Sequence, residues 1–265
     1  MVIDAHVHIF PDRLAPKALK SLSEICKSPY YMDGTADGMR QALKSWGVDA
    51  AVCMNIATKP KQQLSVNRFA ASVQGDGLYC FGSVHPDAPD AIDELRRIKE
   101  LGLYGVKLHP DYQDFIVDDS RLFPIYEAIS ELQLPVTFHT GWDPYSPNLT
   151  HAPSQAVAKV ADLFPRMTII AAHMGGLNRY DESEEYLAGK ENVYLDTALS
   201  CRNCSPEQML RLIRRHGAEK VLFASDCPWS RSSDELAFLE RLPLTSKERD
   251  AIYFQNAKRL LNLPI

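Results

Sequence analysis

The feature that most constrains the fold of this chain is an alternation of short β-rich runs with helix-like runs, repeated eight times. The predicted strands are Val2–His8, Ala50–Asn55, Leu78–His85, Tyr104–His109, Pro135–Thr140, Thr168–His173, Asn192–Thr197 and Lys220–Asp226. Strand–helix–strand repeats with short connections favour parallel strands. The pattern predicts a single α/β domain over residues 1–265, a closed (β/α)8 TIM barrel, with an open doubly wound sheet as the alternative.

Helix-like runs separate these strands, and several begin or end at residues that cap helices. Ser205–Pro206 and Pro153–Ser154 are typical helix starts, and Gly47, Gly102 and Gly217 stand where helices end. The predicted helices are Ala36–Trp46, Lys61–Gln74, Pro89–Leu101, Leu122–Leu132, Ser154–Phe164, Ser183–Ala188, Pro206–His216 and Ser233–Leu242. An extra C-terminal helix is predicted over Ser246–Leu261.

Polar residues gather at the C-terminal ends of the predicted strands. They are His6, His8, His85, Lys107, His109, His139, His173, Asp196 and Asp226. In a parallel barrel these ends meet at one face, which carries the active site in TIM-barrel enzymes. Six of the eight histidines lie there, so we expect them to converge.

Side-chain alternation predicts which of these residues point into the barrel. In the first strand, Asp4, His6 and His8 share one face, and the other face is apolar. Further along the chain, apolar neighbours flank Lys107, His139 and His173, so these three residues are predicted to face inward and their neighbours outward.

Imidazoles together with a carboxylate are the ligand set preferred by borderline cations such as Zn²⁺. A His-x-His step on a strand suits such a site, because both rings lie on the same side. The sequence therefore predicts that His6 and His8 form half of a metal site. Asp4 lies one step deeper, and we expect it to support the site or the core rather than to bind the ion.

The strand-end motifs resemble a known family. The motifs are "DAHVHIF", "GVKLHP", "VTFHTG", "IIAAHMGG" and "VLFASDCPW", with "NAKRLL" in the last helix. In this order they resemble the metal-dependent amidohydrolase superfamily. They are most similar to the amidohydrolase-2 branch, which includes aminocarboxymuconate semialdehyde decarboxylase and the pyrone dicarboxylate lactonase.

The resemblance implies that His6, His8, His139 and Asp226 bind one divalent ion. Zn²⁺ is the expected ion and Mn²⁺ the alternative, because imidazole and carboxylate accept both. The resemblance also implies that Asp226 and His173 are catalytic, with His173 beside the metal-activated water.

The resulting expectation is a hydrolase of a small carboxylated ester, lactone or amide that uses a metal-activated water. The alternative is a decarboxylase with the same metal ligands. A phosphodiesterase or nuclease and a non-catalytic metal-stabilised barrel are the two other hypotheses. The net charge of −5 argues against a phosphate-binding surface.

Lys107 has three interpretations. It contacts a substrate carboxylate, or it is carbamylated and bridges a second metal ion as in binuclear members of the superfamily, or it is ion-paired inside the barrel mouth. His109 is assigned either to the wall of the site or to a structural role. His85 is expected to be structural.

Loops that follow the strands carry further candidate substrate-binding residues. Arg179 and Arg231 suit a carboxylated small molecule, because a guanidinium pairs well with a carboxylate. Trp142 and Trp229 either stack on a planar substrate or cap the barrel. Lys107 and His109 complete the predicted substrate-binding set.

Composition adds expectations about location and partners. The chain has no apolar run of membrane-spanning length, no predicted signal peptide and no basic surface that indicates nucleic acid. Six scattered cysteines, including a lone "CRNC", are typical of a reduced cytoplasmic protein. The family resemblance suggests a homodimer, and the residues leave the oligomeric state open.

Overall fold

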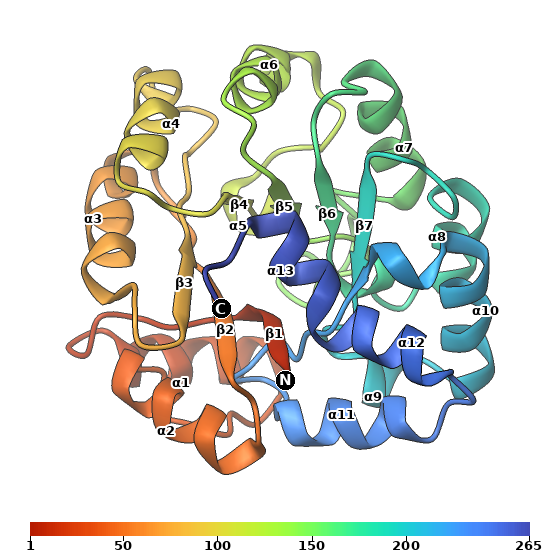
Figure 1. The fold of residues 1–265 in the computed structure, drawn as a ribbon. Helices are drawn as coiled ribbons and strands as arrows, with labels where there is room; N and C mark the ends of the chain where they lie inside the picture. Colours follow the sequence, from red (N-terminus) through yellow and green to blue (C-terminus); the bar gives the residue numbers. More distant parts are fainter.

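The protein is a closed TIM barrel, and its computed structural model describes residues 1–265 (Figure 1). Parallel hydrogen bonding joins β1 to β3 in one set and β4 to β8 in another. The bridge between Gly82 and Val106 and the bridge between Val7 and Cys227 close the ring. The strands are β1 (Ile3–Val7), β2 (Ala50–Met54), β3 (Leu78–Phe81), β4 (Val106–Leu108), β5 (Val136–Phe138), β6 (Ile169–Ala171), β7 (Val193–Asp196) and β8 (Val221–Leu222).

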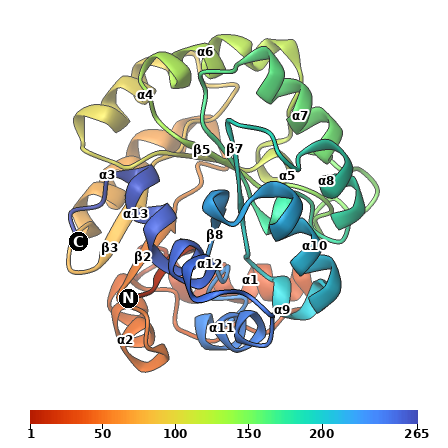
Figure 2. The same cartoon turned by 45° about the vertical axis from the view of Figure 1, so that its right-hand side comes forward.

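Helices surround the strands on the outside (Figure 2). They are α1 (Ala15–Cys26), α2 (Ala36–Trp46), α3 (Gln63–Val73), α4 (Ala91–Glu100), α5 (Pro110–Gln113), α6 (Phe123–Glu131), α7 (Ser154–Leu163), α8 (Tyr180–Tyr186), α9 (Ser200–Asn203), α10 (Pro206–His216), α11 (Ser232–Glu240), α12 (Ser246–Asp250) and α13 (Asn256–Leu261). Short 3₁₀ turns occupy η1 (Pro60–Gln62), η2 (Ser120–Leu122), η3 (His173–Gly175) and η4 (Ala218–Lys220).

The predicted bounds of α2 and α10 are confirmed, and local caps explain why. The Thr35 hydroxyl accepts the backbone N–H of Gly38, and the Ser205 hydroxyl accepts that of Gln208. Gly47 ends α2 in a left-handed conformation with φ of 70°. These signals lie within a few residues of each other, so the sequence alone reveals them.

Four α-helices were either not predicted or differ from their predicted bounds by more than two residues. The helix α1, which buries only Ala15 and Leu19, was not predicted. The single-turn helices α5 and α9 were also missed, and α8 starts at Tyr180 and ends before the predicted segment does. No helix of the molecule combines the length and apolar character needed to cross a membrane.

The predicted C-terminal helix is present in three parts. A π-helical turn over Ala251–Gln255 separates α12 from α13. Figure 1 shows α13 lying across the barrel near the start of β1. Ala257 and Leu261 of α13 belong to the same apolar cluster as Ile3 and Ala50, which face the barrel interior. The last helix therefore closes the amino-terminal end of the barrel.

The predicted alternation along β1 is wrong at Asp4. The strand pairs Asp4 with Ala51 but Val7 with Cys53. Between these two pairs β1 contains one residue more than β2, which is a β-bulge. Val7 and Cys53 consequently pack in the outer core, between strands and helices. Asp4 points the same way, and its Oδ2 accepts the hydroxyl of Ser232 at the start of α11 at 2.7 Å. The bulge separates Asp4 from the two histidines.

The alternation of side chains along β6 does not explain why His173 faces the barrel interior. Ile169 and Ala171 pack outward, whereas Ile170, which was predicted to face outward, lies in the interior cluster. His173 has a φ of 57°, in the left-handed region that non-glycine residues rarely occupy. This turn after β6, rather than strand parity, directs the ring. Val106 and Leu108 do pack outward beside Lys107, as predicted.

Candidate metal centre

Three ligand atoms meet at the C-terminal ends of β1 and β8. His8 Nε2 lies 3.2 Å from His6 Nε2 and 3.1 Å from Asp226 Oδ1, and His6 Nε2 lies 3.4 Å from the same Oδ1. All three atoms fall within 4.8 Å of one another, a spacing that one metal ion can bridge. We call His6, His8 and Asp226 the β1–β8 group. Asp226 reaches it from a left-handed backbone with φ of 66°.

Hydrogen bonds at the far nitrogens fix the tautomers of both histidines. His8 Nδ1 lies 2.9 Å from the carbonyl of Met54, which only accepts, so Nδ1 carries the proton. His6 Nδ1 likewise donates to Asp196 Oδ2 at 2.8 Å. Both Nε2 atoms are therefore lone-pair acceptors that face a carboxylate oxygen. Two imidazole lone pairs and a carboxylate oxygen at this spacing form a donor set that fits a divalent metal ion.

Asp196 is the residue that orients this group. Its Oδ1 accepts the backbone N–H groups of His173 at 2.8 Å and Ala198 at 3.1 Å, while Oδ2 accepts His6. The side chain is fully buried, and burial raises its pKa. The sequence places Asp196 at a strand end without revealing this role, because its partners come from other strands.

His173 lies next to the β1–β8 group. Its ring centroid is 5.5 Å from that of His6. Nδ1 donates to the carbonyl of Ala198 at 3.1 Å, which leaves Nε2 as an acceptor facing His139 Nδ1 at 3.0 Å. The location of His173 beside His6 is thus consistent with the catalytic role predicted for it from the sequence.

His139 is not part of the β1–β8 group. It belongs to a second group with His109 and Asp143, all three buried. His139 Nε2 lies 3.3 Å from Asp143 Oδ2 and is buried without a hydrogen-bond partner. Burial raises the pKa of Asp143 to about 7, the nearby Asp111 adding to the effect. Asp143 was not among the predicted site residues, although its position four residues after His139 is a usable signal.

His109 packs against His139 within the second group. Its ring stacks on His139 with centroids 4.4 Å apart and on Tyr112 with centroids 3.7 Å apart. The Gln113 side chain accepts the backbone N–H of His109 at 2.8 Å and donates to the carbonyls of Ala57 and Val84. Gln113, a second residue missed in the sequence, thereby fixes the end of β4 to the ends of β2 and β3.

Lys107 is buried inside the barrel and is only 1% exposed. Its Nζ lies 3.4 Å from His6 Nε2, and no carboxylate oxygen lies within 4.0 Å of it. The structure therefore does not contain the ion pair considered for this residue. Burial lowers the pKa of Lys107 to about 8, against the opposing charges of Asp196 and Asp226.

The two tryptophans proposed for substrate binding, Trp142 and Trp229, differ in what they contact. The backbone N–H of Trp229 donates to the Asp226 carbonyl at 2.9 Å, so this loop adjoins the site. The indole of Trp142 donates to the Pro147 carbonyl at 3.3 Å.

Arg179 and Arg231 do not contact the β1–β8 group. Arg179 is ion-paired with Glu182 at 2.8 Å, and Arg231 with Asp234 at 2.9 Å. Their side chains are nearly half exposed. The structure therefore leaves both arginines at the surface with carboxylate partners of their own.

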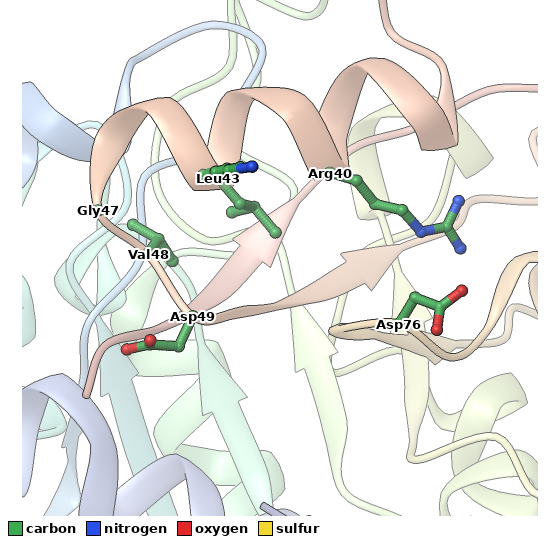
Figure 3. A pocket seen from close by; sticks show the side chains of 7 residues that line it. Arg40, Leu43, Gly47, Val48, Asp49 and Asp76 are labelled. Atoms are coloured by element: carbon green, nitrogen blue, oxygen red, sulfur yellow. The ribbon is translucent and has the colours of Figure 1, made fainter.

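A surface hollow lies at the other end of the barrel (Figure 3). It opens between the end of α2 and the turns that precede β2 and β3, that is, at the amino-terminal ends of the strands. Its lining residues are Arg40, Leu43, Lys44, Gly47, Val48, Asp49 and Asp76. The hollow shares no residue with either histidine group and does not extend the site.

Comparison with known proteins connects the chain to one family. A family model described as Amidohydrolase matches residues 3–263. Among curated proteins, the chain is similar to the gamma-resorcylate decarboxylase of Polaromonas sp. (strain JS666 / ATCC BAA-500), with 22% identity over 219 residues. That match covers 65% of this chain and 66% of the relative, just under two thirds of its length.

Solved structures show the same fold. An uncharacterised TIM-barrel protein from Bordetella bronchiseptica superposes with a TM-score of 0.80 at 18% identity, covering 98% of both chains. A 5-carboxyvanillate decarboxylase from Novosphingobium aromaticivorans DSM 12444, complexed with manganese and 4-hydroxy-3-methoxy-5-nitrobenzoic acid, gives 0.76 at 16% identity, covering 99% of this chain and 96% of that one. The predicted TIM barrel is confirmed.

Proposed function

Because the chain belongs to the amidohydrolase family, we propose that it is a metal-dependent decarboxylase of a small aromatic carboxylic acid. The observation that carries the proposal is the convergence of three acceptor atoms from His6, His8 and Asp226 at the mouth of the barrel. These atoms form a donor set that fits a divalent cation, and the site lies at the face where TIM-barrel enzymes act.

The choice of reaction is supported by the relatives. Both named relatives are decarboxylases of aromatic acids. The hydrolase of an ester, lactone or amide, which was the first expectation from the sequence, has no named relative among them. The decarboxylase, which was the alternative, is therefore the better supported reaction.

We assign the metal to His6 Nε2, His8 Nε2 and Asp226 Oδ1. His139, the fourth ligand that the family resemblance implies, lies in the second group with His109 and Asp143, so the assignment does not depend on it. Mn²⁺ is favoured over Zn²⁺, since the related 5-carboxyvanillate decarboxylase holds manganese. A divalent ion bound there would supply a fixed positive charge that orients an anionic substrate.

The remaining chemistry is a proton transfer. Decarboxylation of an aromatic acid breaks the bond between ring and carboxylate, releases CO₂, and leaves an electron pair on the ring carbon that one proton must neutralise. Asp226 Oδ1 faces the histidines, so its Oδ2 is available to carry that proton. His173, held by Ala198 and Asp196, is placed to orient the acid or stabilise its charge.

The test is CO₂ release from Mn²⁺-loaded enzyme with 2,6-dihydroxybenzoate, 5-carboxyvanillate and related hydroxybenzoates. In D₂O the product is expected to carry one deuterium at the carbon that lost CO₂. Asp226→Asn is expected to lower turnover at least about 100-fold, because it removes a ligand and the proton carrier together.

A parallel panel of aryl esters, lactones and amides separates the two reactions. Hydrolysis of this panel without CO₂ release from any acid would reject the decarboxylase and restore the hydrolase. Arg96→Gln is a matched control, since Arg96 is exposed and pairs only with Asp93. It is expected to leave turnover unchanged.

A further inference from the structure

A lysine inside a barrel core needs a partner for its charge. The Lys107 ammonium is almost fully buried, and the loss of hydration that this causes must be offset by an anion or by hydrogen bonds. Its one polar contact is His6 Nε2 at 3.4 Å. That nitrogen is the atom assigned above to the metal, so the contact is lost once a cation is held there.

The surrounding carboxylates do not take over this role. Asp111, Asp143, Asp196 and Asp226 all lie close enough to act on Lys107 electrostatically. None of them places an oxygen within 4.0 Å of Nζ. The ammonium therefore sits in a negative environment without a direct partner.

A second unpartnered polar group lies beside it. Thr137 on β5 is the register partner of Lys107 on β4, and its apolar neighbours Val136 and Phe138 pack outward. The Thr137 hydroxyl consequently faces the barrel interior, where it is buried and makes no hydrogen bond. Two adjacent strands thus place, at paired register positions, a buried ammonium without an anionic partner and a buried hydroxyl without a hydrogen bond, and both groups can donate to an oxygen anion.

We propose that Lys107 and Thr137 form an anion subsite for a second acidic group of the substrate, distinct from the group held by the metal. The inference rests on the proposed function and narrows its substrate class to aromatic acids with two anionic groups. The cation at the β1–β8 group and the ammonium of Lys107 are two adjacent positive centres, since Nζ lies 3.4 Å from His6 Nε2, and two positive charges are balanced by two anionic groups. Arg179 and Arg231 do not compete, because each already pairs with its own carboxylate.

The test compares dissociation constants of Mn²⁺-loaded enzyme for benzoate and for phthalate, isophthalate and terephthalate, which place the second carboxylate at three spacings. At least one dicarboxylate is expected to bind wild type about tenfold or more tightly than benzoate. In Lys107→Met this preference is expected to fall to within about twofold, and in Thr137→Val to about a third of its wild-type value. Each preference is the ratio of two dissociation constants measured on the same protein, so a change in benzoate affinity alone does not alter it.

The matched control is Lys159→Met, which removes the same charge at the surface, where Lys159 pairs with Asp118 at 2.7 Å. It is expected to keep the full preference. Equal binding of all four acids by wild type, or an undiminished preference in Lys107→Met, overturns the subsite. If Lys107→Met does not fold or hold manganese, an undiminished preference in Thr137→Val overturns it. If no acid releases CO₂ but the preference for a dicarboxylate is present and depends on Lys107, the decarboxylase proposal is rejected and the subsite proposal is retained.

Discussion

His6 Nδ1 and Asp196 Oδ2 are 2.8 Å apart, and this hydrogen bond joins the first strand of the barrel to the seventh. It forces the His6 proton onto Nδ1 and turns Nε2 toward His8 and Asp226. A ligand in a metal site is thus oriented by a residue 190 positions later in the chain.

Asp196→Asn is expected to weaken metal binding about 10- to 100-fold. The aspartate accepts N–H groups at both oxygens, whereas an asparagine must place its amide NH₂ against one of these donors. The measurement is a competition titration of Mn²⁺ against a fluorescent chelator. Asp181→Asn, on the exposed face of α8, is the control. Equal Mn²⁺ affinity of wild type, Asp196→Asn and Asp181→Asn would refute the orienting role of Asp196.

Asp4→Ala is expected to destabilise the fold by about 3–5 kcal/mol without changing metal content. The carboxylate accepts the N–H groups of His6 and Ser225 and the hydroxyl of Ser232, all of which would be left buried and unpaired. Urea unfolding measures the loss. Loss of the ion from a folded Asp4→Ala variant would instead make Asp4 part of the metal site.

Gly141→Ala is expected to destabilise the protein by more than about 2 kcal/mol and to displace the loop after β5. Gly141 has φ of +89°, and a Cβ there would lie 2.1 Å from the backbone nitrogen of Leu177. Gly102→Ala is the matched control. Gly102 is also left-handed, with φ of +67°, but a Cβ would meet no atom within 4 Å, so we expect a cost of about 1 kcal/mol. Similar melting temperatures for the two variants would contradict the steric argument.

His216 is expected to make the fold sensitive to acid. Its Nδ1 accepts the Gly189 N–H and its Nε2 donates to the Val193 carbonyl, so both bonds need the neutral ring. Burial lowers the pKa of His216 from 6.5 to about 4. The unfolded chain therefore binds a proton between these values that the native state does not, and stability present above pH 6.5 is lost as the pH falls toward 4.

The measurement is urea unfolding of wild type and His216→Gln at pH 7.5 and 5.0. Glutamine both donates and accepts but does not titrate, so wild type should lose about 2 kcal/mol relative to the variant by pH 5. Other buried acids titrate in both proteins and cancel in the difference. If the difference in unfolding free energy between wild type and His216→Gln is the same at pH 7.5 and 5.0, the pKa of His216 is not lowered in the native state.

Much of the fold could be predicted from patterns in the sequence alone. Capping residues set the ends of α2 and α10, and apolar neighbours on β4 show that Lys107 faces inward. The motif order was also sufficient to identify the family, since residues 3–263 match its model. The caps and the direction of Lys107 depend on residues that are close in sequence, and the family match depends on the order of short motifs along the chain, so the sequence alone reveals them.

Tertiary structure alone decided the contacts of the site. The bulge in β1 turned Asp4 to the outer face, and left-handed turns aimed His173 and Asp226 inward. Closure of the barrel brought Asp196 to His6 and placed His139 beside Asp143. Side-chain direction past the end of a strand depends on individual φ values and on partners from distant strands, and neither is recorded in a local pattern.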